Sequence, residues 1–188
     1  MKRHLFLTGP IGCGKSTVLM ASLGEKRNQA GGFLTVRRRY ENGKPAYFML
    51  MTPDGREKEI FLDLTGPEPR LNLNVFDRLG VDILRRSENS PFLVLDEIGG
   101  IELLCPEFMA ELDKILDSDI PIIGVVKGAG PVGSLVETLG LSREYEEASH
   151  RLRTQLREDP RTTLYESSHY DKTALALAKH WVKEYAHE

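Results

Sequence analysis

Cysteine is scarce in this chain, with only Cys13 and Cys105 among 188 residues. Two cysteines cannot form the framework of cross-links that stabilises small secreted domains, which favours a reducing compartment. The sequence also lacks any stretch approaching the roughly 18 apolar residues that cross a bilayer. Its net charge of −3 provides neither a broad basic field for nucleic acid nor an acidic tail. The composition therefore argues against a disulfide scaffold, a membrane-spanning protein and a nucleic-acid-binding protein.

The first residues resemble the start of a secretory signal, because Met1–His4 carries two basic side chains. Only three apolar residues, Leu5–Leu7, follow before Gly9, whereas a signal peptide has an apolar region of about 7–15 residues. We therefore expect a cytoplasmic protein. A chain of 188 residues is long enough to bury most of its apolar surface in one domain, so we expect a single domain over residues 1–188.

The most informative segment reads G-P-I-G-C-G-K-S and matches the phosphate-binding loop G-x-x-x-x-G-K-[ST]. It lies between an apolar strand-like run and a helical pattern that ends at Gly24, as the motif requires. Glycines let backbone N–H groups surround phosphates at the positive end of the helix. Lys15 is expected to reach the β and γ phosphates, and Ser16 to bind Mg²⁺. The predicted nucleotide-binding residues are Gly9, Pro10, Ile11, Gly12, Cys13, Gly14, Lys15, Ser16 and Thr17.

A second motif is the apolar run Phe92–Leu95 followed by Asp96 and Glu97. Carboxylates at the carboxyl end of a parallel strand face the crevice where open α/β sheets bind ligands. We expect Asp96 to hold Mg²⁺ together with Ser16, and Glu97 to orient or deprotonate the attacking water. Because side chains alternate along a strand, only one of the two acids is expected to approach the metal directly. The predicted catalytic residues are Glu97 and Lys15.

The remaining pattern predicts an α/β fold, a P-loop NTPase three-layer sandwich with a mostly parallel sheet. Strands are expected at residues 5–8, 92–95, 120–126 and 162–165, and helices at 16–23, 74–86, 106–117, 142–158 and 171–185. Between residues 31 and 64, three strand-like runs separated by glycine-containing turns predict an antiparallel meander at one edge of the sheet. A glycine-rich stretch at residues 128–131 precedes a largely helical region from about residue 140 to the end.

Three segments, at residues 8–17, 32–35 and 95–103, form a characteristic combination, of which the run Asp-Glu-Ile-Gly-x-x-Glu from Asp96 to Glu102 is the most specific. Over roughly residues 3–127 the chain resembles the small nucleoside-triphosphatases first described from thermophilic bacteria, a family that includes a cancer-related human member. The resemblance implies slow, Mg²⁺-dependent hydrolysis of several nucleoside triphosphates. It also implies that Glu102 belongs to the site, where we expect it to order its neighbours. The basic segment Val36–Arg39 departs from the acidic residues usual there, and base recognition stays open.

Several basic residues allow two interpretations each. Arg37, Arg38 and Arg39 either approach the γ phosphate or, as is commoner on an edge strand, form a solvated face that prevents pairing. Lys127, directly after a buried strand, either senses the γ phosphate or faces solvent. A helix near residues 142–158 carries Arg143, Arg151, Arg153 and Arg157 beside the apolar stripe Leu141, Tyr145, Ala148, Leu152 and Leu156. A surface helix is the simpler interpretation, and a kinase lid is the alternative.

Three functions follow from these motifs. The leading one is hydrolysis of nucleoside triphosphates to diphosphate and phosphate, since Glu97 can activate water. The runner-up is a nucleotide or nucleoside kinase, which needs a second substrate pocket and a lid. The third is a nucleotide-dependent switch or energising subunit with an unknown protein partner. The sequence lacks the Asn-Lys-x-Asp motif of guanine-specific switches and the Leu-Ser-Gly-Gly signature of transporter ATPases.

Overall fold

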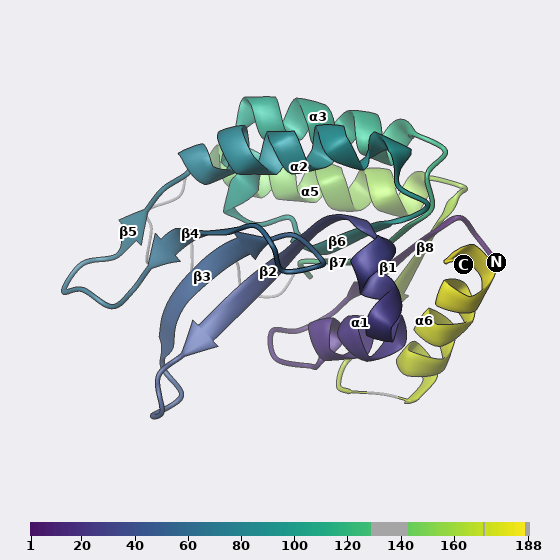
Figure 1. The fold of residues 1–188 in the computed structure, drawn as a ribbon, viewed down its shortest axis with the longest axis horizontal. Helices are drawn as coiled ribbons and strands as arrows, with labels where there is room; N and C mark the ends of the chain where they lie inside the picture. The colour runs from purple at the N-terminus through teal and green to yellow at the C-terminus, as the bar shows by residue number, and fades with distance from the viewer. Residues whose placement is uncertain (129–142, 171, 187–188) are drawn as a thin grey trace.

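One eight-stranded sheet runs through the computed structural model, which describes residues 1–128, 143–170 and 172–186 (Figure 1). Its strand order is β5-β4-β3-β2-β6-β7-β1-β8. The strands are β1 (His4–Thr8), β2 (Gly31–Arg39), β3 (Pro45–Met51), β4 (Lys58–Asp63), β5 (Arg70–Leu71), β6 (Leu93–Ile98), β7 (Ile122–Val126) and β8 (Thr162–Glu166). Strands β2, β6, β7, β1 and β8 pair in parallel, and β3, β4 and β5 continue from β2 as an antiparallel meander. The predicted sheet is therefore confirmed.

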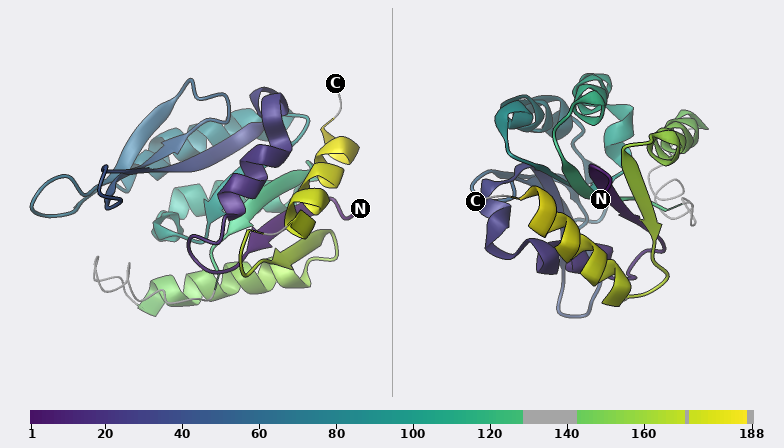
Figure 2. Two further views of the ribbon diagram at one scale, coloured as in Figure 1. Left: turned by 90° about the horizontal axis from the view of Figure 1, so that it is seen from below. Right: turned by 90° about the vertical axis from the view of Figure 1, so that its right-hand side faces the viewer.

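Helices cover both faces of this sheet. The helices are α1 (Lys15–Leu23), α2 (Val81–Arg86), α3 (Pro106–Asp117), α5 (Arg143–Glu158) and α6 (Lys172–Tyr185). Shorter helical segments are η1 (Gly24–Gln29), η2 (Phe76–Gly80), η3 (Ser87–Asn89) and η4 (Ile101–Leu104). Helices α1 and α6 lie on one face, and α2, α3 and α5 lie on the other (Figures 1 and 2). The three-layer sandwich is thus confirmed. Across the described ranges, no helix combines the length and apolarity needed to traverse a bilayer.

A separate apolar core lies on each face of the sheet. Phe33, Phe76 and Phe108 pack together on the α2–α3 face, with ring centroids 5.5–5.6 Å apart for the two pairs that include Phe108. On the α1–α6 face, the rings of Phe92 and Trp181 lie 6.2 Å apart. Strands β1 and β7 are buried along their whole length, as expected of parallel strands covered on both sides. Only their carboxyl ends are free to present ligand-binding groups.

Strand β2 lies between β3 and β6 and connects the edge meander to the rest of the sheet. Its first residues pair in parallel with β6, from Gly31 opposite Leu93 to Phe33 opposite Leu95. Gly32 has a φ of +86°, and a Cβ added there would lie 2.1 Å from the carbonyl oxygen of Val94. Only glycine tolerates both the backbone angle and the close approach. This glycine therefore joins the meander to the parallel part of the sheet.

Most other boundaries agree with the sequence pattern, and α3 begins and ends where expected. Beyond Gly128, the predicted glycine-rich stretch lies outside the described residues. Residue 141 of the predicted apolar stripe and residues 142 and 171, which begin two predicted helices, also lie outside them. The two-residue strand β5 was not predicted, since it is too short to show a periodic pattern.

Candidate active site

The phosphate-binding loop turns sharply between β1 and α1. Gly9, Gly12 and Gly14 have φ values of +136°, +80° and +92°, in the region that favours glycine. A Cβ on Gly9 would lie 1.9 Å from the carbonyl oxygen of Ser167, so this position has no room for a side chain. Helix α1 begins directly after the loop, at Lys15. The loop therefore surrounds the positive end of a helix, which is the arrangement that binds phosphate.

The Lys15 side chain folds back over this loop. Its ammonium donates hydrogen bonds to the carbonyl oxygens of Gly9, at 2.9 Å, and Pro10, at 2.7 Å. It also lies 3.5 Å from the sulfur of Cys13. The Cys13 thiol itself donates to the carbonyl of Ser167 at 3.4 Å, and Cys13 does not line the main pocket. Lys15 is thus positioned over the loop, whereas Cys13 turns its side chain away.

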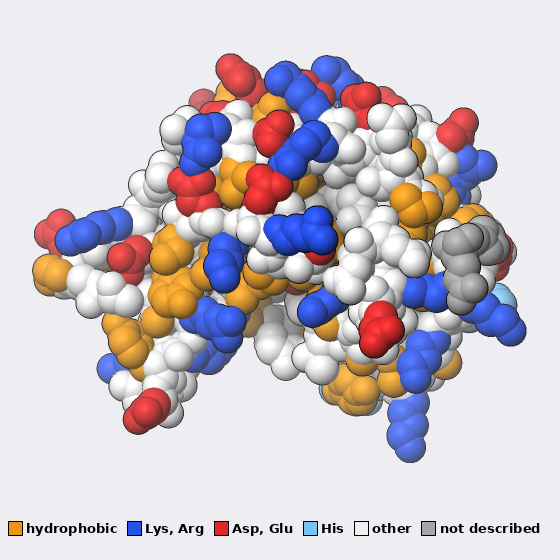
Figure 3. All heavy atoms as spheres, viewed as in Figure 1, with side chains coloured by type: hydrophobic (Ala, Val, Ile, Leu, Met, Phe, Trp, Pro, Cys, Tyr) orange, Lys and Arg blue, Asp and Glu red, His pale blue; other side chains and the backbone are white. Residues whose placement is uncertain are grey.

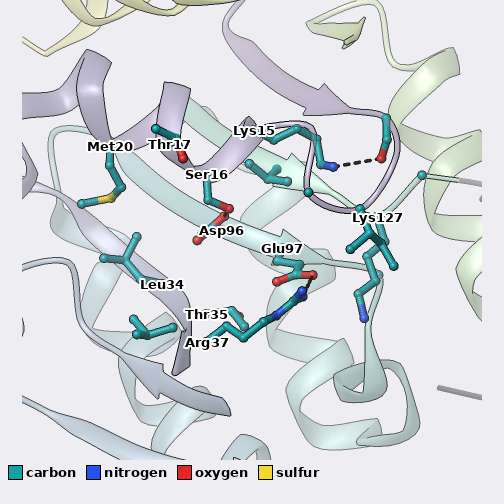
Figure 4. A pocket seen from close by; sticks show the side chains of 18 of the residues that line it. Lys15, Ser16, Thr17, Met20, Leu34, Thr35, Arg37, Asp96, Glu97 and Lys127 are labelled. Atoms are coloured by element: carbon teal, nitrogen blue, oxygen red, sulfur yellow. Dashed lines mark hydrogen bonds and ion pairs between the residues drawn. The ribbon is translucent and has the colours of Figure 1, made fainter. Parts of the chain in front are cut away.

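Ser16 and Asp96 meet across two elements, since the Ser16 hydroxyl donates to Asp96 Oδ1 at 2.8 Å (Figure 4). Asp96 is 3% exposed, and burial, together with the neighbouring charge of Glu97, raises its pKa to about 7. A hydroxyl and a carboxylate are hard oxygen donors, and Mg²⁺ commonly uses one or two such protein ligands beside phosphate and water. In the described part of the chain, no three His, Cys, Asp or Glu side chains cluster to hold a metal alone. This oxygen pair therefore fits Mg²⁺ held jointly with a bound triphosphate.

Glu97 lies in an unusual backbone conformation. Its φ of +66° is the only positive value for a non-glycine residue in the described ranges, a conformation that costs about 1–3 kcal/mol. The β6–β7 register also shifts between Leu95 and Ile98. Both acids line the main pocket, but Asp96 bonds to Ser16 of α1, whereas Glu97 pairs with Arg37 beside Phe48 of the α2–α3 core, so the expected alternation to opposite faces agrees with the structure. The strand has already left regular β geometry at this point.

Of the three arginines at the end of β2, Arg37 is the one that lies at the pocket. Its guanidinium donates to Glu97 Oε1 at 3.0 Å and lies 4.8 Å from the centre of the Phe48 ring. The solvated-face interpretation is therefore wrong for Arg37, because an ion pair and an aromatic ring hold its side chain at the pocket (Figure 4). That interpretation does describe Arg38 and Arg39, which are both exposed.

The turn that follows Glu97 is held from two sides. Buried Glu102 accepts hydrogen bonds from the backbone N–H groups of Gly99, at 2.6 Å, and Gly100, at 2.8 Å. Burial raises the pKa of Glu102, while the nearby Lys127 ammonium opposes this shift. From α5, the Tyr145 hydroxyl donates to the carbonyl of Gly99 at 3.1 Å. These hydrogen bonds hold the turn in place, as expected if Glu102 orders its neighbours. Tyr145 contributes one of them.

One pocket of about 1110 Å³ lies at the carboxyl ends of β1 and β6, and its lining includes most of the phosphate loop, both acids, Arg37 and Tyr145. Lys127, half-buried, lines the pocket, and its ammonium makes no hydrogen bond or ion pair within the ranges that the structure describes. Helix α5 contributes Tyr145 and Ser149 to the lining but none of its arginines. It packs an apolar stripe against the core, so the surface-helix interpretation agrees with the structure. The site therefore combines the predicted loop and acids with Arg37, Lys127 and Tyr145.

A family model described as NTPase matches residues 4–158. The chain belongs to this NTPase family. It is 34% identical over 129 residues to "Nucleoside-triphosphatase THEP1" of Thermotoga sp. (strain RQ2), an alignment that covers 65% of this chain and 73% of the relative. It is 30% identical over 146 residues to the "Cancer-related nucleoside-triphosphatase homolog" of Mus musculus, covering 67% and 76% of the two chains. The predicted family resemblance and enzyme class, a nucleoside-triphosphatase, are thereby confirmed.

The fold also has a counterpart among solved structures. The crystal structure of THEP1 from the hyperthermophile Aquifex aeolicus matches with a TM-score of 0.67, over 97% of this chain and 98% of that one. The two sequences are 20% identical, so this likeness concerns the fold alone. It agrees with the P-loop architecture predicted from the loop and the acidic strand end.

Proposed function

We propose that the NTPase uses Mg²⁺ to hydrolyse nucleoside triphosphates to diphosphate and phosphate, with Glu97 activating the water. The observation that carries this proposal is the convergence of the phosphate loop, the Ser16–Asp96 oxygen pair and Glu97 on one pocket. The loop and Lys15 bind the triphosphate, and Ser16 and Asp96 hold Mg²⁺. When bound, the cation neutralises phosphate charge that develops during transfer. Both cysteines carry free thiols, which supports the proposal of a cytoplasmic location.

Glu97 acts on the attacking water, and Arg37 acts on the Glu97 carboxylate and on the transferred phosphoryl group. The Glu97 carboxylate accepts a proton from the water as the water oxygen attacks the γ phosphorus. The bond between that phosphorus and the β–γ bridging oxygen breaks, and the nucleoside diphosphate leaves. Arg37 orients that carboxylate through the 3.0 Å ion pair. Its remaining N–H groups stabilise negative charge on the transferred phosphoryl group, as an arginine does in related chemistry.

The first experiment is product analysis with ATP and Mg²⁺ in the absence of any acceptor. We expect free phosphate and ADP in equal amounts, and loss of this activity when EDTA removes the cation, because Ser16 and Asp96 alone offer too few ligands for tight metal binding. Phosphate-release and nucleotide chromatography measure the two products. Turnover that continues in excess EDTA would contradict the metal assignment, and ATP consumed without free phosphate would contradict hydrolysis.

Base selectivity should be weak. The residues that converge at the site recognise phosphate and metal, and the sequence contains no known base-reading motif. We therefore expect kcat/KM values for ATP and GTP within about tenfold, or roughly 1.4 kcal/mol of discrimination. Parallel steady-state phosphate release with the two nucleotides measures the ratio. A preference above about a thousandfold would reveal a dedicated base pocket.

Arg37→Ala should lower kcat by about tenfold or more, because the Glu97 carboxylate loses its partner and the phosphoryl group loses a cation. Arg37→Lys keeps the charge without the planar guanidinium and should recover part of the rate. Arg39→Ala is the matched control, since Arg39 is an exposed arginine on the same strand. Equal kcat values for Arg37→Ala and Arg39→Ala would remove Arg37 from the mechanism.

A further inference from the structure

The main pocket extends beyond the groups that bind phosphate. One part of its lining consists of Met20, Ala21, Leu34, Val36 and Met51, with Arg27 beside them. We call this part the apolar groove. Figure 4 shows Met20 and Leu34 on the side of Asp96 that lies away from Lys15 and Lys127. Apolar side chains offer phosphate neither hydrogen bonds nor charge, so the groove suits a different kind of group.

The sheet register creates this groove. Leu34 lies opposite Met51 in the β2–β3 pair, and Val36 is two residues farther along β2, so the three side chains share one face. It is the face that α1 covers, because Leu34, Val36, Met51 and Met20 all belong to the core on that side. Helix α1 does not extend over β3, and Figure 3 shows a hollow between the two. The groove thus lies between α1 and the β2–β3 strands.

The groove also has a charged rim. Arg27, on η1, is exposed, and its side chain makes no hydrogen bond or ion pair within the described ranges. An apolar wall suits a ring, and a free guanidinium suits an anionic group. We infer that the apolar groove binds a second small molecule beside the nucleotide: an aromatic ring that carries an anionic group directed to Arg27. This inference rests on the proposed function in one respect, which is that the nucleotide occupies the phosphate loop.

The nucleotide's own base is the competing occupant. The groove, however, adjoins Asp96 and Glu97, where the γ phosphate ends, and the base lies at the other end of a triphosphate. A separate pocket of about 360 Å³ opens on the far side of the loop. Its lining includes Ile11 and Tyr170, which are 64% and 49% exposed. The base therefore has an apolar and aromatic surface of its own, which leaves the groove to a second molecule.

Methionine methyl NMR tests this inference directly. Met20 and Met51 line the groove, whereas Met109 packs against the core on the opposite face and serves as an internal control. The full chain, labelled with ¹³C in its methionine methyl groups and loaded with Mg²⁺ and a nonhydrolysable ATP analogue, is titrated with phenylacetate and with 2-phenylethanol. We expect both aromatic probes to shift the Met20 and Met51 signals saturably, and phenylacetate to bind at least about threefold more tightly because of its charge.

Variants localise the two halves of the site. Arg27→Gln should remove the advantage of phenylacetate over 2-phenylethanol, and Lys44→Gln, at an exposed hairpin tip, should keep it. Val36→Asn should weaken both probes, whereas Ile60→Asn, an exposed apolar residue of the same meander that does not line the groove, should not. Phosphate release is measured for all four variants, so that a failure of hydrolysis and a failure of probe binding are seen separately.

Three results would overturn the binding site, and a fourth would overturn its anionic end. The first is the absence of saturable shifts at Met20 and Met51 with either probe, and the second is an equal shift at Met109. The third is a shift of the Met20 and Met51 signals that the ATP analogue causes without any probe and that inorganic tripolyphosphate does not cause. This would place the nucleotide's base in the groove. Probe binding that is retained in Arg27→Gln with its full charge preference would overturn the assignment of the anionic end.

Discussion

Lys15→Ala is expected to weaken nucleoside triphosphate binding by about tenfold to a hundredfold. Hydrogen bonds to charged groups contribute roughly 1.5–3 kcal/mol each, which corresponds to this range of affinity. The Lys15 ammonium lies over the loop, within 2.9 Å of two backbone carbonyls that it can exchange for phosphate oxygens. The variant therefore removes the one flexible cation that belongs to the loop itself.

Calorimetric titration with a nonhydrolysable analogue and Mg²⁺ measures this loss. Lys44→Ala is the matched control, because it removes an exposed lysine at a hairpin tip. Since Lys15 also binds carbonyls within its own loop, thermal unfolding of the variant separates a folding defect from a lost phosphate contact. Unchanged affinity in a folded Lys15→Ala protein would contradict the phosphate-loop assignment.

The parts of the fold that are local in sequence could be predicted well. The buried strands β1 and β7 are continuous apolar runs, and α3 shows helical periodicity after Pro106. The phosphate loop is contiguous, so its glycines and Lys15 could be read directly. The pairing of Ser16 with Asp96 followed from strand topology, because a loop after one parallel strand and an acid after another meet at the same sheet edge.

Features that depend on tertiary geometry could not be predicted. Arg37 looked like one of three similar arginines, and only the β2–β3 pairing, which places it opposite Phe48, distinguishes it from its neighbours. The left-handed conformation of Glu97 has no sequence signal, since glutamate rarely adopts it. The sequence pattern places Tyr145 in an apolar stripe, and its hydroxyl is the signal of a further role, because a buried tyrosine usually needs a hydrogen-bond partner.

The second major prediction separates binding from chemistry. Glu97→Gln keeps the size and much of the hydrogen-bonding shape of the side chain but removes the carboxylate that accepts a proton from water. We expect kcat to fall by about a hundredfold or more, as for loss of a positioned general base, with nearly unchanged nucleotide affinity. Lys15, Ser16 and Asp96 are untouched, so triphosphate and Mg²⁺ should still bind.

Because turnover in this family is expected to be slow, the assay must be a sensitive phosphate-release measurement with excess Mg²⁺. Glu41→Gln, at an exposed turn, is the matched control and should hydrolyse at the wild-type rate. A wild-type rate for Glu97→Gln would remove Glu97 as the base. Glu102 would be a poor substitute, because its Oε1 already accepts two backbone hydrogen bonds in a buried turn. Hydrolysis would then proceed without a general base at Glu97, and another group would have to orient the attacking water.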